Sequence, residues 1–163
     1  METLVKESLN LHQFKNKVKV KPKNRRALRK NKTPKFKTDI SFVGVNAAGI
    51  SSKLSSFDNL LKTLEPSVFF LQETKLKKQG RIKTEHSKGY QIFELNRTDK
   101  LGGGLAIGAL EEVDPVWIGE GNDEVEILVV EIAVADLRIR CICGYAPQES
   151  DPSEKKEKFW AKL

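Results

Sequence analysis

The stretch Phe69-Phe70-Leu71-Gln72-Glu73-Thr74 is the part of the sequence that decides the fold. Its apolar start, preceded by Val68, predicts a short buried strand. An amide, a carboxylate and a hydroxyl then follow without a spacer. A carboxylate is costly to place beside an apolar core unless a partner meets it. The first question is therefore which groups meet Glu73.

A strand and a helix are predicted on the N-terminal side of this stretch. Residues 40–45 form an apolar run typical of a strand. Residues 51–65 predict an amphipathic helix, with a serine near its start as the N-cap and Pro66 at its end. A strand, a helix and a strand of this length typically form a right-handed crossover between parallel strands. The apolar stripe of the helix consists of Leu54, Phe57, Leu60, Leu61 and Leu64.

The C-terminal side continues with strands that alternate in polarity and ends with a helix signature. Asp151 or Ser153 is expected to cap that helix. Strands with one long helix among them predict an α/β chain built on a mixed sheet. The predicted strands are residues 90–95, 104–110, 113–119, 124–134 and 136–146, and the helix signature spans residues 150–163.

Two cysteines, Cys141 and Cys143, lie two residues apart on a predicted strand, so their side chains share one face. This spacing favours a pair of small buried hydrophobes. A metal site would need further ligands, and no C-x-x-C pattern is present. With only two histidines in the chain, zinc chemistry has little support.

The basic charge of the chain is concentrated in its first 38 residues. They hold 13 Lys and Arg against 2 Asp and Glu, a net of +11, whereas residues 39–163 hold 16 against 20, a net of −4. Because large apolar groups are scarce there, we expect a disordered tail. Such a tail indicates nucleic acid as a partner or a nuclear address, and the alternative is a solvated extension without function. The absence of a long apolar run and of an apolar signal core argues against a membrane and favours an intracellular setting, which the basic tail narrows to the nucleus.

Polar side chains gather where the predicted strands end. In a crossover unit the parallel strands end at the same edge, so Asn46 and Glu73 are expected to share one rim. Tyr145 also follows an apolar strand and joins them if that strand runs the same way. A carboxylate beside an amide and a phenol suits a hard divalent cation and a phosphate oxygen. Each residue also has a plainer interpretation, as a turn, surface or core residue.

The ordered set VNAAGI, SVFFLQETKL, GGGLAIG and CGYAPQ resembles the endonuclease/exonuclease/phosphatase superfamily over residues 39–163. Within it, the set is most similar to endonuclease domains of LINE-type (non-LTR) retroelements, which are themselves similar to AP endonucleases. The resemblance implies that Glu73 ligates Mg²⁺ or Mn²⁺, that Asn46 lies near the metal and the phosphate, and that Tyr145 contacts the scissile phosphate. It also implies DNA as the partner.

The resemblance covers the N-terminal half of that family's four-layer α/β/β/α sandwich. The Gly-Asp-x-Asn motif and the closing Asp-His pair of the family do not occur in this sequence. We therefore expect a truncated domain with weak or no activity. We also expect one sheet with its helix, whose second face, carrying residues such as Ile107, Val129 or Ile142, lacks a partner and allows self-association.

Three functions stay open at this point. The first is a metal-dependent phosphodiesterase of the retroelement endonuclease type. The second is a non-catalytic nucleic-acid binder that acts through residues 1–38. The third is a phosphomonoesterase or lipid phosphatase of the same superfamily.

Overall fold

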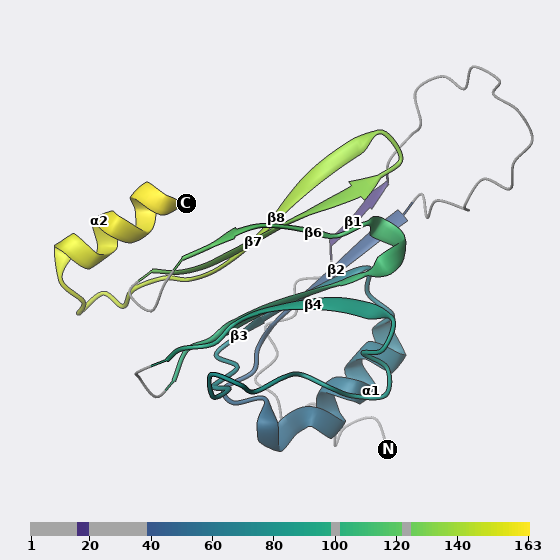
Figure 1. Cartoon of the computed structure of the whole chain (residues 1–163), viewed down its shortest axis with the longest axis horizontal. Coiled ribbons are helices and arrows are strands. Elements are labelled where there is room, and N and C mark those ends of the chain that lie inside the picture. The colour runs from purple at the N-terminus through teal and green to yellow at the C-terminus, as the bar shows by residue number, and fades with distance from the viewer. Residues whose placement is uncertain (1–15, 20–38, 99–101, 122–124) are drawn as a thin grey trace, which may run out of the picture.

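Eight strands and two α-helices make up the part of the chain that the computed structural model describes, residues 16–19, 39–98, 102–121 and 125–163 (Figure 1). The strands are β1 (Asn16–Lys19), β2 (Asp39–Asn46), β3 (Val68–Gln72), β4 (Tyr90–Leu95), β5 (Leu105–Leu110), β6 (Val116–Glu120), β7 (Glu126–Val134) and β8 (Leu137–Tyr145). The helices are α1 (Leu54–Leu64) and α2 (Ser153–Lys162), with short 3-10 turns at Ser51–Lys53 and Glu111–Val113. The strands and helices predicted for residues 39–163 are thereby confirmed.

The larger sheet has five strands in the order β1-β2-β3-β5-β4. The strands β2 and β3 are parallel, with Asn46 opposite Gln72 at their ends, as the strand–helix–strand pattern predicts. The strand β5 runs antiparallel to both β3 and β4. The ends of β2 and β3 therefore lie side by side and bring Asn46 next to the segment that carries Glu73.

The strand β1 lies inside the segment predicted to be a disordered tail, and these four residues are extended. The backbone of β1 pairs antiparallel with β2, from Asn16 opposite Phe42 to Lys19 opposite Asp39. Without β1, β2 would be an edge strand with a row of unpaired backbone groups, which favours the addition of a further strand. Residues 1–15 and 20–38, on which the rest of that prediction falls, lie outside the described residues.

A second sheet of three antiparallel strands, β6-β7-β8, packs against the first (Figure 1). The expectation of a single sheet with an uncovered face is therefore wrong. Ile107 is fully buried between the sheets, because the chain crosses to the second layer between β5 and β6. The second sheet itself has an open outer face, where Val129 is partly buried and Ile142 is 44% exposed. The expected solvent-exposed apolar face is therefore found on the outer side of the smaller sheet and not on the larger one.

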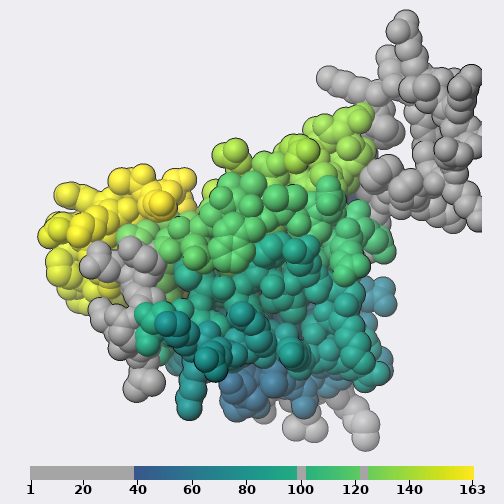
Figure 2. Space-filling model, viewed as in Figure 1, coloured from purple at the N-terminus to yellow at the C-terminus, as the bar shows by residue number. Residues whose placement is uncertain are grey.

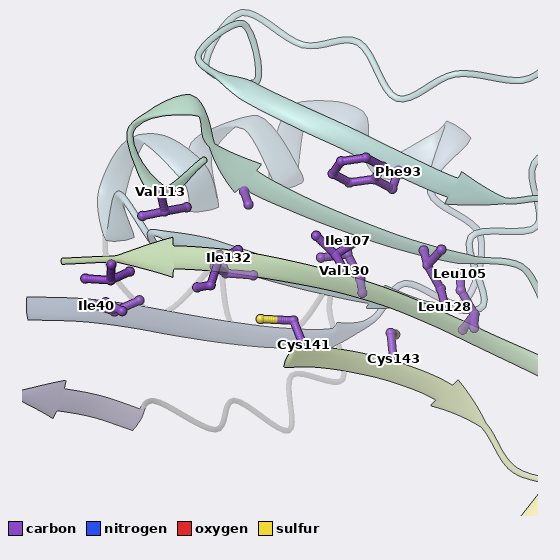
Figure 3. Packing of buried hydrophobic residues seen from close by; sticks show 13 residues of the cluster. Ile40, Phe93, Leu105, Ile107, Val113, Leu128, Val130, Ile132, Cys141 and Cys143 are labelled. Carbon is purple, nitrogen blue, oxygen red and sulfur yellow. The ribbon is translucent and has the colours of Figure 1, made fainter. Parts of the chain in front are cut away.

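Two apolar clusters hold the layers together. The first fills the space between the sheets and includes Leu105 and Ile107 from β5 with Leu128 and Val130 from β7 (Figure 3). The second lies between the other face of the larger sheet and α1, so that sheet is covered on both sides. The helix contributes Phe57, Leu60 and Leu61 to this cluster, in agreement with the predicted stripe.

Cys141 and Cys143 face the space between the sheets as free, buried thiols, which confirms them as small core residues. Burial raises the pKa of Cys141 to about 11, and burial together with the nearby Glu126 carboxylate raises that of Cys143 to about 12. Neither thiol is ionised at neutral pH, so neither suits nucleophilic chemistry.

The N-caps predicted for the two helices, a serine for α1 and Asp151 or Ser153 for α2, are wrong. Lys53 precedes α1 and Pro152 precedes α2, and neither start has a side-chain cap hydrogen bond. Instead, a 3-10 turn leads into α1. The helix α2 lies against one end of the second sheet (Figure 2), where its Phe159 is buried with Val125 and Ile127. Thus α2 has a packing partner within the chain and begins a fourth layer. None of the helices in the described part of the chain is long and apolar enough to cross a membrane.

Candidate functional site

Asn46, Glu73 and Tyr145, the three predicted site residues, meet at one end of the sandwich. The side-chain amide of Asn46 donates to Oε1 of Glu73 over 3.0 Å. The phenol of Tyr145 donates to the same oxygen, also over 3.0 Å. Asn46 ends β2 and Glu73 follows β3, whereas Tyr145 ends β8 in the facing sheet. The site is therefore assembled from both sheets rather than from one rim.

The backbone around Glu73 has an unusual conformation. Glu73 and Lys75 have positive φ angles of 53° and 51°, which few residues other than glycine adopt. Hydrogen bonds on both sides hold this turn: Gly49 N donates to the Glu73 carbonyl over 2.8 Å, and Thr74 N donates to the Gly104 carbonyl over 3.1 Å. Such strained turns persist where the surroundings fix them, and they are frequent at functional sites.

The surroundings of Glu73 favour its ionised form. The hydrogen bond from Asn46 contributes most to lowering the pKa of the Glu73 carboxyl, and the Tyr145 phenol and the Lys75 ammonium act in the same direction against the effect of burial. Conversely, burial and the hydrogen bond to Glu73 raise the pKa of Tyr145. At neutral pH the pair is thus a carboxylate and a neutral phenol, and the phenol remains a hydrogen-bond donor.

A polar pocket of about 340 Å³ opens beside these residues. Three cationic side chains line it, Lys75, Arg97 and Lys155, and each of them is paired with a carboxylate of the same lining. Its other lining residues are Glu73, Gly102, Gly103, Glu126, Tyr145, Ala146, Pro147, Gln148 and Asp151.

The donor set at Glu73 fits a hard divalent cation in part. Both neutral donors bind Oε1, whereas Oε2 lies 3.5 Å from the ammonium of Lys75. A carboxylate oxygen that meets a cation at the edge of a polar pocket suits Mg²⁺, which takes few protein carboxylates and retains several waters. Both ends of the Asn46 amide are already engaged, because its Oδ1 accepts a hydrogen bond from Ala48 N over 3.0 Å. Glu73 is therefore the residue best placed to hold the cation.

Several residues of the site were missed by sequence reasoning. Gln72 links the two sheets, since its side-chain amide donates to the Gly144 carbonyl over 2.6 Å. Glu126 is only 3% exposed and forms an ion pair with Arg97. The alternation of β7 carries a usable signal for Glu126, because it falls in register with the inward-facing Leu128. A charged residue at an inward position requires a buried partner.

A second group of candidate ligands lies elsewhere, where α1 meets the loop before β4. Ligand atoms of Asp58, Glu85 and His86 lie within 4.8 Å of one another. The carboxylate of Asp58 already accepts the His86 backbone N–H over 2.8 Å, and its other oxygen lies 2.9 Å from His86 Nδ1. These contacts give Asp58 and His86 a structural role, because they attach the loop before β4 to α1.

Comparisons with known proteins support the fold. No family model matches the chain, and no curated protein matches it. Among solved structures, an AP endonuclease from Leishmania major has a TM-score of 0.55 at 19% identity, over 72% of this chain and 43% of the other. The endonuclease domain of TRAS1, a telomere-specific non-LTR retrotransposon, has a TM-score of 0.53 at 14% identity, over 74% and 52%. A 3′–5′ exonuclease from Neisseria meningitidis has a TM-score of 0.51 at 22% identity, over 74% and 48%.

The fold of this chain is shared with these AP endonuclease, retrotransposon endonuclease and exonuclease structures, as the ordered motifs predict. The chain spans about half the length of the solved structures that it matches. At these identities the likeness concerns the fold, and the chemistry of the site has to be argued from its own residues.

Proposed function

We propose that this chain binds a divalent cation, Mg²⁺ or Mn²⁺, at Glu73 and holds a DNA phosphodiester there, as a metal-dependent phosphodiesterase of the retroelement endonuclease type. The observation that carries the proposal is the convergence of Asn46 and Tyr145, from two facing sheets, on a single oxygen of Glu73. Two neutral donors on one carboxylate oxygen fix its orientation and leave the other oxygen to meet a cation.

Each residue then has a separate task. Glu73 holds the cation, and Asn46 orients Glu73 and remains the predicted second contact to the metal and phosphate. Tyr145 has one phenol proton, which it gives to Glu73 before substrate binds and to a phosphate oxygen once the phosphodiester is bound. When bound, the cation neutralises charge on the phosphate and lowers the pKa of a coordinated water. Lys75, which pairs with Glu73 in the structure, is placed to contact the phosphate once the cation takes its place.

For the 163-residue chain we propose weak or no turnover. The motifs that supply the base and the second phosphate contact in the resembling family do not occur in this sequence. Residues that act as one catalytic set lose nearly all activity when one of them is missing. Cation binding therefore tests the proposed metal site more directly than DNA cleavage does.

The test is a titration of the full chain with Mn²⁺, followed by electron paramagnetic resonance, beside nicking of supercoiled plasmid. We expect saturable Mn²⁺ binding that Glu73→Gln abolishes, with nicking near background. Glu131→Gln is the matched control, because Glu131 lies on the outer face of β7 and pairs there with Arg138 and Arg140. Equal Mn²⁺ binding by the wild type and Glu73→Gln would refute the site, and nicking that depends on Glu73 would refute the weak turnover.

A phosphomonoesterase is the second candidate, since one of the similar structures is a 3′ phosphatase from Neisseria bound to product DNA hairpin. Release of inorganic phosphate from a 3′-phosphorylated hairpin, compared with nicking, separates the two reactions. A role for residues 1–38 in nucleic-acid binding or nuclear targeting rests on their net charge of +11. Replacing the Lys and Arg residues of 20–38 by Gln, which leaves the strand β1 in place, should weaken salt-dependent DNA binding and leave Mn²⁺ binding unchanged.

A further inference from the structure

Behind the candidate site lies a buried network that neither the motifs nor the proposed chemistry uses. One carboxylate oxygen of Glu126 accepts a hydrogen bond from Gly104 N over 2.6 Å, and the other pairs with the guanidinium of Arg97. The side chain of Glu126 is 3% exposed and that of Arg97 is 19% exposed. A carboxylate buried to this degree must satisfy both oxygens, so its position is tightly determined.

The network holds a glycine turn in a conformation that side chains would disrupt. Gly103 and Gly104 have φ angles of 61° and 86°. A Cβ at Gly103 would lie 2.3 Å from Arg97 Nε and 2.5 Å from Glu126 Oε1, and one at Gly104 would lie 2.5 Å from Thr74 Oγ1. Gly102 also has a positive φ, of 92°, but a Cβ there would meet nothing within 4 Å. The close packing against Arg97 and Glu126 is thus specific to Gly103.

The glycine turn in turn holds the backbone of the candidate metal ligand. Thr74 N donates to the Gly104 carbonyl over 3.1 Å, and Lys75 N donates to the Gly103 carbonyl over 2.8 Å. These two amides belong to the two consecutive peptides that follow Glu73, whose φ is positive. A continuous path of contacts therefore runs from Glu126 through Gly103 and Gly104 to the turn of Glu73.

We propose that Glu126, with Arg97, is a positioning residue for Glu73: the pair fixes the Gly103–Gly104 turn, which fixes the backbone turn that presents the Glu73 carboxylate. The expected effect on metal affinity rests on the proposed function. The claim that the pair fixes the backbone turn at Glu73 does not. Groups that hold a metal ligand in place typically change metal affinity 10–100-fold when they are altered.

The first experiment measures amide hydrogen exchange of the full chain by NMR. In Glu126→Gln and in Gly103→Ala we expect the amides of Thr74 and Lys75 to exchange at least about tenfold faster, because the turn that accepts their hydrogen bonds opens more often. The amide of Leu110, which donates to the Ser67 carbonyl at the other end of the sheet, is the internal reference and should not change. Gly102→Ala is the control for the positive φ alone.

The second experiment is the Mn²⁺ titration of the same variants. We expect about tenfold weaker binding in Glu126→Gln and Gly103→Ala, and unchanged binding in Glu131→Gln. Unchanged exchange at Thr74 and Lys75 in Glu126→Gln overturns the positioning role. Faster exchange with no Mn²⁺ binding even by the wild type keeps the positioning role and refutes the proposed function. Faster exchange with unaltered Mn²⁺ affinity overturns the claim that this turn sets the geometry of the ligand.

Discussion

Two carboxylates at the same end of the sandwich, Glu73 and Glu126, have opposite surroundings. The side chain of Glu73 is 21% exposed, takes two neutral donors on one oxygen and lies 3.5 Å from the ammonium of Lys75, which is 45% exposed. Glu126 is 3% exposed and is bound by a guanidinium and a backbone amide. A guanidinium pairs with a carboxylate through a rigid fork, whereas an ammonium on a long stem is easily displaced. The difference separates a carboxylate that can accept a new cation from one whose cation is part of the structure.

The largest expected effect tests the structural half of this comparison. Glu126→Ala leaves the largely buried guanidinium of Arg97 without its carboxylate, so we expect a loss of about 3–5 kcal/mol in the free energy of unfolding. Glu131→Ala, which removes two exposed pairs on the same strand, should cost no more than about 1 kcal/mol. Urea unfolding followed by circular dichroism measures both values. Equal losses in the two variants would contradict the structural role of Glu126.

Tyr145→Phe tests the contribution of the facing sheet to Glu73. Removing the phenol oxygen should cost about 1 kcal/mol of unfolding free energy and raise the pKa of Glu73. Tyr90→Phe is the matched control, because the Tyr90 phenol donates to the Pro66 carbonyl over 2.6 Å, away from the site. Both variants should lose similar stability in urea, but only Tyr145→Phe should move the Glu73 titration in a carboxyl NMR experiment. A shift of equal size in the control would show that the effect is not local.

Asn46→Ala tests how the surroundings of Glu73 affect the pH dependence of the unfolding free energy. Because the folded protein lowers the pKa of Glu73 below its ordinary 4.5, this carboxylate contributes stability above pH 4.5 that is lost as pH falls through the folded pKa. Asn46 is the largest cause of that lowering, so the variant should be less stable than the wild type above pH 4.5. The gap should narrow at lower pH, where Glu73 is protonated in both proteins. Unfolding curves at several pH values test this, and a pH-independent gap would refute the linkage.

The smallest effect is expected for Lys75→Met. The Lys75 side chain is 45% exposed and its ammonium lies 3.5 Å from the Glu73 carboxylate, so the pair should contribute less than about 0.5 kcal/mol to stability. Removing a cation that competes for Glu73 should leave Mn²⁺ affinity equal to or above that of the wild type. A destabilisation of several kcal/mol in urea would mean that this pair resembles Glu126–Arg97 after all.

The order of strands and helices was predictable from periodicity, because the apolar runs are short, regular and separated by polar turns. The partition of those strands into two sheets was not. In the sequence only a short turn separates β5 from β6. Its length does not indicate that the chain passes to a different sheet after Pro115. Tyr145 was therefore placed on the correct end of the molecule but expected on the same sheet as Asn46.

The residues that meet at Glu73 were predicted through a resemblance, whereas its support was missed. The Gly102–Gly104 run is part of the GGGLAIG motif, but a glycine indicates a backbone requirement without identifying the neighbour that imposes it. The partner of Glu126 is Arg97, which lies 29 residues away along the chain. Pairings of this kind depend on tertiary structure. The sequence shows the charged residue at an inward strand position but does not identify its partner.

The hydrogen bond from Gln72 to the Gly144 carbonyl has a consequence for how damage to the core would be detected. Together with the contact of Cys143 Sγ with the Leu71 carbonyl, it joins the two layers directly beneath the bond between Tyr145 and Glu73. A shift of one layer over the other would change the length of that last bond. Because the hydrogen bond to Glu73 contributes to raising the pKa of Tyr145, the titration of this phenol would report on the alignment of the two layers.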